Sequence, residues 1–152
     1  MRVRLIWVGK TRNEHLRALI DEYVQRLGRF VRCEIVEVRE GTSGEERAII
    51  EEGRRITGML GDNSPVVLLD LTGRQWSSPE LAAELEGWQL RAVKELAFVV
   101  GSHAGVSAEV RKRADICWSL SRLTLTHEMA RLVLVEQLYR AYTIMRGLPY
   151  QK

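Results

Sequence analysis

The chain has 152 residues and a net charge of +3, with 45% hydrophobic and 28% charged residues, a composition that is typical of a globular domain and excludes a disordered chain. Its longest apolar runs reach four or five residues, as at 96–100, whereas a membrane helix needs about 20, so we expect no membrane span. Cys33 and Cys117 lie far apart without a CxxC motif, which favours a reduced, cytoplasmic protein with neither a structural metal nor a disulfide.

Alternating apolar patterns and helix-capping residues predict ten elements. In chain order they are a strand at 2–8, a helix from Asn13 to about 27, a strand at 34–38, a helix at 45–60, a strand at 66–71, a helix beginning at Ser77 or Ser78, a strand at 96–100, a short helix at 107–113, a strand at 116–120 and a long helix from Thr126 to about 145. This alternation predicts a single α/β domain over residues 1–152, in which helices cover both faces of a parallel sheet.

Ligands bind such sheets beyond the carboxyl ends of the strands. Here those ends lead into the segments 71–76, 101–105 and 121–125. Two glycines in the segment 101–105 let backbone approach a ligand closely, although a plain tight turn between strand and helix is the more common reason for such glycines.

Charge is segregated along the chain. Residues 1–32 carry a net charge of +5, residues 33–109 carry −7 and residues 110–152 carry +5. If the two basic ends meet in the folded chain, they form a positive surface that attracts phosphate. A solvated face without special function is the alternative interpretation.

Several familiar motifs are incomplete. Residues 9–11 read Gly-Lys-Thr, but Arg4 stands where a phosphate-binding loop needs its first glycine. His127 and Glu128 begin a zinc-binding HExxH motif, but Arg131 replaces its second histidine. His103 stands where a nucleophile elbow needs serine, and no GxGxxG motif occurs. These failures argue against a phosphate-binding P-loop, a zinc-binding histidine pair, a serine hydrolase and a standard dinucleotide site.

The last predicted helix is apolar on all sides around residues 132–135. A helix of this kind is buried more completely than one sheet face allows. It belongs either to a subunit interface or to the centre of the core, and the pattern alone favours neither.

The C-terminal third of the chain carries a combination of motifs that is specific for one family. They are G-S-H-A-G at 101–105, W-S-L-S-R-L-T-L-T-H at 118–127, E-Q-L-Y-R-A at 136–141 and I-M-R-G at 144–147, with L-D-L-T-G-R-Q-W-S-S-P at 69–79 upstream. The chain resembles, over essentially its whole length, the small SPOUT methyltransferases of the RlmH type, which methylate a pseudouridine of bacterial 23S ribosomal RNA.

The resemblance implies a C-terminal trefoil knot, which no pattern rule predicts because knots are very rare. It also implies a homodimer and S-adenosyl-L-methionine bound in the knot loops, without metal or membrane. The cofactor-binding residues carried over from the family are Leu69, Gly101, Ser102, Leu120, Ser121, Arg122, Leu123, Thr124, Leu125 and Thr126. Most are small or apolar, which suits a site where backbone groups read the adenine edge and apolar side chains enclose the ring.

The implied reaction is methyl transfer to N3 of pseudouridine. The resemblance favours the assembled ribosome as the substrate, because so small a chain has no added RNA-binding domain. The protein must align donor and acceptor and then accept the N3 proton. Arg131 and Arg140 are candidates for holding phosphate or the cofactor carboxylate, and His127, Glu136 and Tyr150 are candidates near the acceptor. We expect the helix dipole to disfavour a protonated His127.

Three positions depart from the family pattern. Ser102 replaces the second glycine of the loop, Thr126 replaces a proline, and Gln151 replaces a terminal histidine. Glutamine cannot act as a base at neutral pH. Two alternatives therefore stay open beside the methyltransferase: a catalytically impaired RNA- or ribosome-binding relative, or a methyltransferase with another RNA target. A nucleotide-binding α/β domain of unrelated function is a third.

Overall fold

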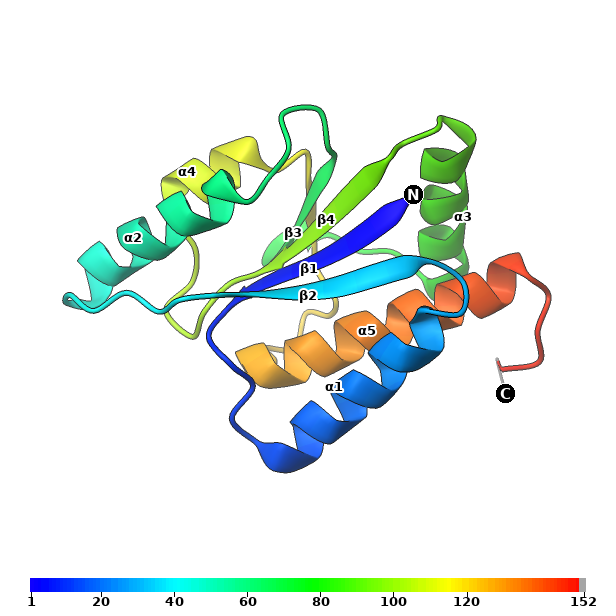
Figure 1. The fold of residues 1–152 in the computed structure, drawn as a ribbon, viewed down its shortest axis with the longest axis horizontal. Coiled ribbons are helices and arrows are strands. Elements are labelled where there is room, and N and C mark those ends of the chain that lie inside the picture. Colours follow the sequence, from blue (N-terminus) through cyan, green and yellow to red (C-terminus); the bar gives the residue numbers. More distant parts are fainter. Residues whose placement is uncertain (151–152) are drawn as a thin grey trace.

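The computed structural model describes residues 1–150 as a five-stranded sheet with the strand order β2-β1-β4-β3-β5 (Figure 1). All of its strand pairs are parallel. The strands are β1 Arg2–Val8, β2 Arg32–Val38, β3 Val66–Arg74, β4 Glu95–Val100 and β5 Ile116–Trp118, and the helices are α1 Glu14–Leu27, α2 Glu45–Gly58, α3 Ser78–Leu90, α4 Ala108–Arg113 and α5 His127–Met145. The predicted α/β class and element order are confirmed.

Helices cover both faces of the sheet: α1, α3 and α5 lie on one face, and α2 and α4 on the other (Figure 1). Alternate residues of β1 serve the two layers, since Leu5 packs with the first group of helices and Ile6 with the second. This alternation follows from the pleat of a strand, which points successive side chains to opposite faces. No helix within residues 1–150 is long and apolar enough to cross a membrane.

Short polar side chains fix where the helices begin. Asn13 accepts hydrogen bonds from the backbone at the start of α1, and Ser107 and Thr126 do the same for α4 and α5. Ser77, the first of the two predicted starting residues, forms a capping box with Glu80 at the start of α3. Each cap satisfies backbone N–H groups that the helix itself leaves unpaired.

The boundaries of β3 and β5 differ from the prediction. β3 runs on to Arg74, and β5 ends at Trp118 and not at residue 120. The reason is an irregular pairing: Trp118 is paired with both Leu69 and Arg74, so residues 70–73 bulge out of the ladder. The Ser119 amide then bonds to the Arg74 carbonyl, which turns the chain away from the sheet. The bulge and this turn form two walls of the site described below.

α5 lies between α1 and α3 over the sheet (Figure 1). Its Leu134, Leu138 and Tyr142 are fully buried within the chain, so the core interpretation of this apolar helix is confirmed. Its role in a subunit interface stays a prediction, as does the trefoil knot. The pairing of α1 with α5 also brings the two basic ends of the chain together, as the phosphate-binding hypothesis requires.

Candidate functional site

A cavity of about 690 Å³ opens at the carboxyl ends of β3, β4 and β5. Three segments enclose it: residues 69–71 at the bulge of β3, residues 100–106 after β4, and the turn after β5 that leads into α5. We call this space the glycine-loop cavity. Its position agrees with the expectation that ligands bind beyond the carboxyl ends of a parallel sheet.

The glycine-loop cavity brings together nearly all residues that the resemblance assigned to the cofactor. Those that line it are Leu69, Gly101, Ser102, Leu120, Ser121, Leu123, Thr124, Leu125 and Thr126. Arg122 is the exception, because it is exposed and does not line the cavity. The side chain of Leu123 is 75% exposed, which leaves an apolar surface for a bound ring to cover.

The loop after β4 depends on one close backbone approach. A Cβ atom on Gly101 would lie 2.8 Å from a methyl group of Val106 and 3.1 Å from the carbonyl oxygen of Gly105. Ser102 at the neighbouring position does not enter this contact. Its hydroxyl lies 3.4 Å from the Gly105 carbonyl and 3.3 Å from the Ala104 amide, so the serine that departs from the family pattern is engaged by its own loop.

The cavity also holds an ion pair that the sequence analysis missed. The Asp70 carboxylate accepts a hydrogen bond of 2.5 Å from Arg111 of α4 and one of 3.0 Å from the Thr72 hydroxyl. Partial burial acts to raise the pKa of Asp70, but these hydrogen bonds outweigh it and lower the pKa below its ordinary value. The available signal was a carboxylate near the carboxyl end of a buried strand, where parallel sheets place ligand-binding groups.

These residues fit S-adenosyl-L-methionine. The volume lies within the range of about 300–1,000 Å³ that small-molecule sites occupy. An adenine ring needs apolar cover, which Leu123 and Leu125 offer, and backbone donors and acceptors, which the turn after β5 offers. Asp70 can accept hydrogen bonds from ribose hydroxyls or an ammonium group, and Arg111 can bind a carboxylate.

A second, smaller space of about 500 Å³ adjoins the first. Its carboxylates come from Glu40, Glu45, Glu52 and Glu128. We call it the acidic hollow. It shares Ser102, His103, Ala104 and His127 with the glycine-loop cavity, so these residues form the boundary between the two spaces.

His127 lies at this boundary on the first turn of α5. Its pKa is lowered from the ordinary value, first by burial and next by the nearby Arg131 guanidinium. The predicted direction is therefore confirmed, with burial as the main cause. At neutral pH the imidazole is uncharged and has a free ring nitrogen that can accept a proton.

Arg131 does not face either space, contrary to its expected role with phosphate or a cofactor carboxylate. It is fully buried, and its guanidinium donates to the Val8 carbonyl at 2.6 Å and to the Thr11 hydroxyl at 3.0 Å. The same group lies over the Trp7 ring, 5.0 Å from its centre. Arg131 therefore ties the carboxyl end of β1 to α5.

Glu136, Arg140 and Tyr150 form a separate cluster near the other end of α5. The Tyr150 hydroxyl is 3.0 Å from a Glu136 oxygen and 3.1 Å from the Tyr23 hydroxyl, while Arg140 donates to Glu136 at 2.6 Å. Glu136 follows His127 by nine residues, a rise of about 13 Å along a helix, and neither Glu136 nor Tyr150 lines the glycine-loop cavity. Within one chain the predicted catalytic residues therefore do not meet, since His127 lines the cavity, Arg131 is buried against β1, and this cluster lies apart from both. Gln151 lies outside the described residues.

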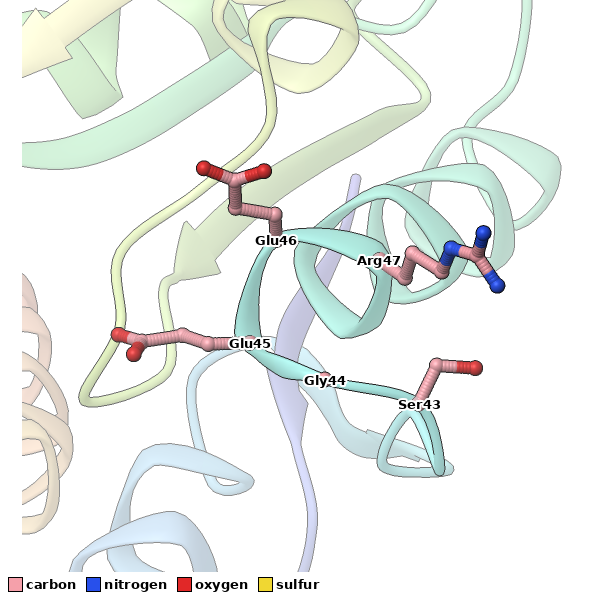
Figure 2. A pocket seen from close by; sticks show the side chains of 5 residues that line it. All are labelled: Ser43, Gly44, Glu45, Glu46 and Arg47. Carbon is pink, nitrogen blue, oxygen red and sulfur yellow. The ribbon is translucent and has the colours of Figure 1, made fainter.

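Figure 2 shows a third, shallow hollow at the N-terminal end of α2, lined by residues 43–47. The side chains of Glu45 and Arg47 point away from each other, and Glu45 reaches toward the loop after β4 (Figure 2). Exposed side chains that diverge in this way do not form a binding site of their own. Glu45 instead joins the lining of the acidic hollow.

Comparisons with known proteins agree with the resemblance that the sequence motifs carry. The family model described as "Predicted SPOUT methyltransferase" matches residues 1–151. A Gloeobacter violaceus protein named ribosomal RNA large subunit methyltransferase H is 44% identical and covers 99% of this chain and 98% of its own length. A protein of the same name from Streptococcus thermophilus is 41% identical and covers 100% of both chains.

Solved structures share the fold. A probable methylase family protein from Haemophilus influenzae superposes with a TM-score of 0.58 at 13% identity, covering 99% of this chain and 70% of that one. A probable methyltransferase from Bordetella pertussis gives a TM-score of 0.56 at 14% identity, covering 92% and 95%.

Proposed function

Because this chain belongs to the SPOUT methyltransferase family, in the group of ribosomal RNA large subunit methyltransferase H, we propose that it methylates N3 of a pseudouridine in bacterial 23S ribosomal RNA with S-adenosyl-L-methionine. The observation that carries the proposal is the glycine-loop cavity, which gathers nine of the ten residues expected to hold the cofactor. The assembled ribosome is the proposed substrate, and the cytoplasm is therefore the proposed compartment.

Different residues of the cavity would bind different parts of the cofactor. The turn after β5 offers backbone groups to the adenine, with Leu123 and Leu125 against its faces. Asp70 and Arg111 offer opposite charges to the polar half of the cofactor. When bound, the cofactor supplies a methyl group already activated by a positively charged sulfur. The protein is left to position the acceptor nitrogen in line with that group and to remove its proton.

The chain is proposed to act as a homodimer. Glu136 lies nine residues along α5 from His127, and Tyr150, which follows the helix, contacts Glu136. Neither residue lines the glycine-loop cavity of its own chain. A catalytic role for them requires that a second copy bring them there. Mixing a Tyr150→Phe protein with a cavity variant tests this requirement. Partly restored activity would come only from mixed dimers, in which the intact cavity of one chain meets the intact Tyr150 of the other.

The test of the function uses methyl-labelled S-adenosyl-L-methionine with ribosomes that lack the modification, and with isolated subunits and free 23S RNA beside them. Label at N3 of a pseudouridine supports the proposal, and label confined to ribosomes supports the assembled substrate. Gly101→Ala should reduce cofactor binding, because its added methyl collides with Val106 and Gly105. Gly58→Ala is the matched control, since nothing lies within 4 Å of its added methyl.

The absence of a terminal histidine favours one second candidate, an RNA-binding relative without turnover. Gln151 cannot accept a proton at neutral pH. Salt-dependent ribosome binding with cofactor binding intact and no methyl transfer would support this candidate. Turnover of the unmodified chain would exclude it.

A further inference from the structure

Two histidines meet at the boundary between the glycine-loop cavity and the acidic hollow. His127 comes from the start of α5 and His103 from the loop after β4, and both line both spaces. Their ring centres are 6.1 Å apart, with planes inclined by 51°. The third histidine of the chain, His15 on α1, lines neither space.

We propose that His103 and His127 act as a pair that accepts the proton of the methylated nitrogen. This inference rests on the proposed function and extends it to a residue, His103, that the resemblance does not assign. The cofactor occupies the glycine-loop cavity, and the acceptor base approaches the boundary from the acidic hollow. A nitrogen at the boundary is then within reach of both a methyl donor and an imidazole.

The transfer balances with groups already named. The N–H proton moves to an imidazole ring nitrogen, and the electron pair left on the base nitrogen forms the new bond to the methyl carbon. The bond between that carbon and sulfur breaks, its electron pair stays on sulfur, and the sulfur becomes neutral. The imidazolium afterwards releases its proton to water.

The charges around the pair suit this role. Charged groups of both signs lie around the pair. Arg131 and Glu128 on α5 and Arg12 on the loop after β1 act on the charge of His127. The other charged residues line the two spaces: Glu40, Glu45 and Glu52 the acidic hollow, and Asp70 and Arg111 the glycine-loop cavity. Burial and Arg131 favour the neutral form of His127 before reaction, and the Glu128 carboxylate favours the cation formed during it. The neighbouring His103 also acts to lower the pKa of His127, because two like charges at this distance repel each other.

The acidic lining also determines what enters. Carboxylates accept hydrogen bonds from N–H groups and repel phosphate. Among the described residues, four carboxylates and one cation, Arg12, line the hollow, and Arg12 pairs with Glu40. This balance favours the N–H edge of a base over the RNA backbone. This arrangement gives the chain a proton acceptor near the cofactor, although its terminal histidine is replaced by Gln151.

The test compares His103→Gln, His127→Gln and the double variant, with His15→Gln as the matched control on an exposed surface. Single-turnover methyl transfer to unmodified ribosomes is measured from pH 5 to pH 8, and S-adenosylhomocysteine binding is measured by calorimetry for each protein. General-base catalysis contributes about 10²–10⁴-fold. We expect His127→Gln to lose a rate factor in that range and His103→Gln to lose about 10-fold and to shift the acidic limb of the pH profile.

Because the two residues act on one proton, the double variant should be no slower than His127→Gln alone. A His103→Gln protein with the wild-type rate and pH profile would overturn the proposal that His103 acts together with His127. A lower rate with an unchanged pH profile also overturns it, since a purely structural role predicts that result. If the unaltered chain binds S-adenosylhomocysteine and transfers no methyl group, the proposed function itself is wrong. The proposed role of the two histidines is then wrong as well.

Discussion

Replacing Arg131 with methionine tests how far one buried cation holds the site together. Its guanidinium donates to Val8 and Thr11 and has no exposed surface. Hydrogen bonds from charged groups contribute about 1.5–3 kcal/mol each, and buried acceptors left unpaired cost a similar amount. Part of this loss of stability is offset, because the substitution also removes the cost of burying a charge. Burial already lowers the pKa of Arg131, and its Nε has no partner among the described residues.

The balance is an expected loss of about 2–4 kcal/mol in the free energy of unfolding. Urea unfolding at a fixed protein concentration measures it, since a dimer would make the result depend on concentration. Arg17→Met is the control, because Arg17 is exposed on α1 and surface changes stay within about 0.5 kcal/mol. A loss below about 1 kcal/mol for Arg131→Met would refute the reasoning that this residue ties β1 to α5.

Four further changes have defined outcomes. Gly73→Ala should destabilise the sheet edge by about 2–4 kcal/mol, because its methyl would lie 2.4 Å from the Cys117 carbonyl oxygen; thermal unfolding checks this, and an unchanged Tm would contradict it. Ser77→Ala removes the acceptor of the α3 capping box and should cost about 1 kcal/mol in urea unfolding. Tyr150→Phe removes the hydroxyl that meets Glu136 and Tyr23 and should cost about 0.5–1.5 kcal/mol, with a larger effect on methyl transfer only if the tyrosine acts in catalysis. His127 has a lowered pKa when folded, so the folded chain binds fewer protons than the unfolded chain. The free energy of unfolding therefore decreases as the pH falls below about 6.5. His127→Gln should make that free energy less dependent on pH between about pH 7 and pH 5, as urea unfolding at each pH would measure.

The sequence determined the order of elements because their signals are local. Apolar runs predicted the buried strands, and Asn13, Ser77 and Thr126 predicted where helices begin. The family motifs also identified nine residues of the glycine-loop cavity, since they lie in short continuous segments at the carboxyl ends of three strands. Each of these inferences needs only a few neighbouring residues.

The tertiary structure decided which of the predicted site residues meet. Arg131 and His127 are one turn apart on α5, yet one is buried against β1 and the other faces the cavities. Asp70 and His103 became site residues only because the bulge of β3 and the loop after β4 close around one space. Their roles depend on contacts between segments far apart in the chain, and such contacts follow from how the sheet and helices pack, which no local pattern contains.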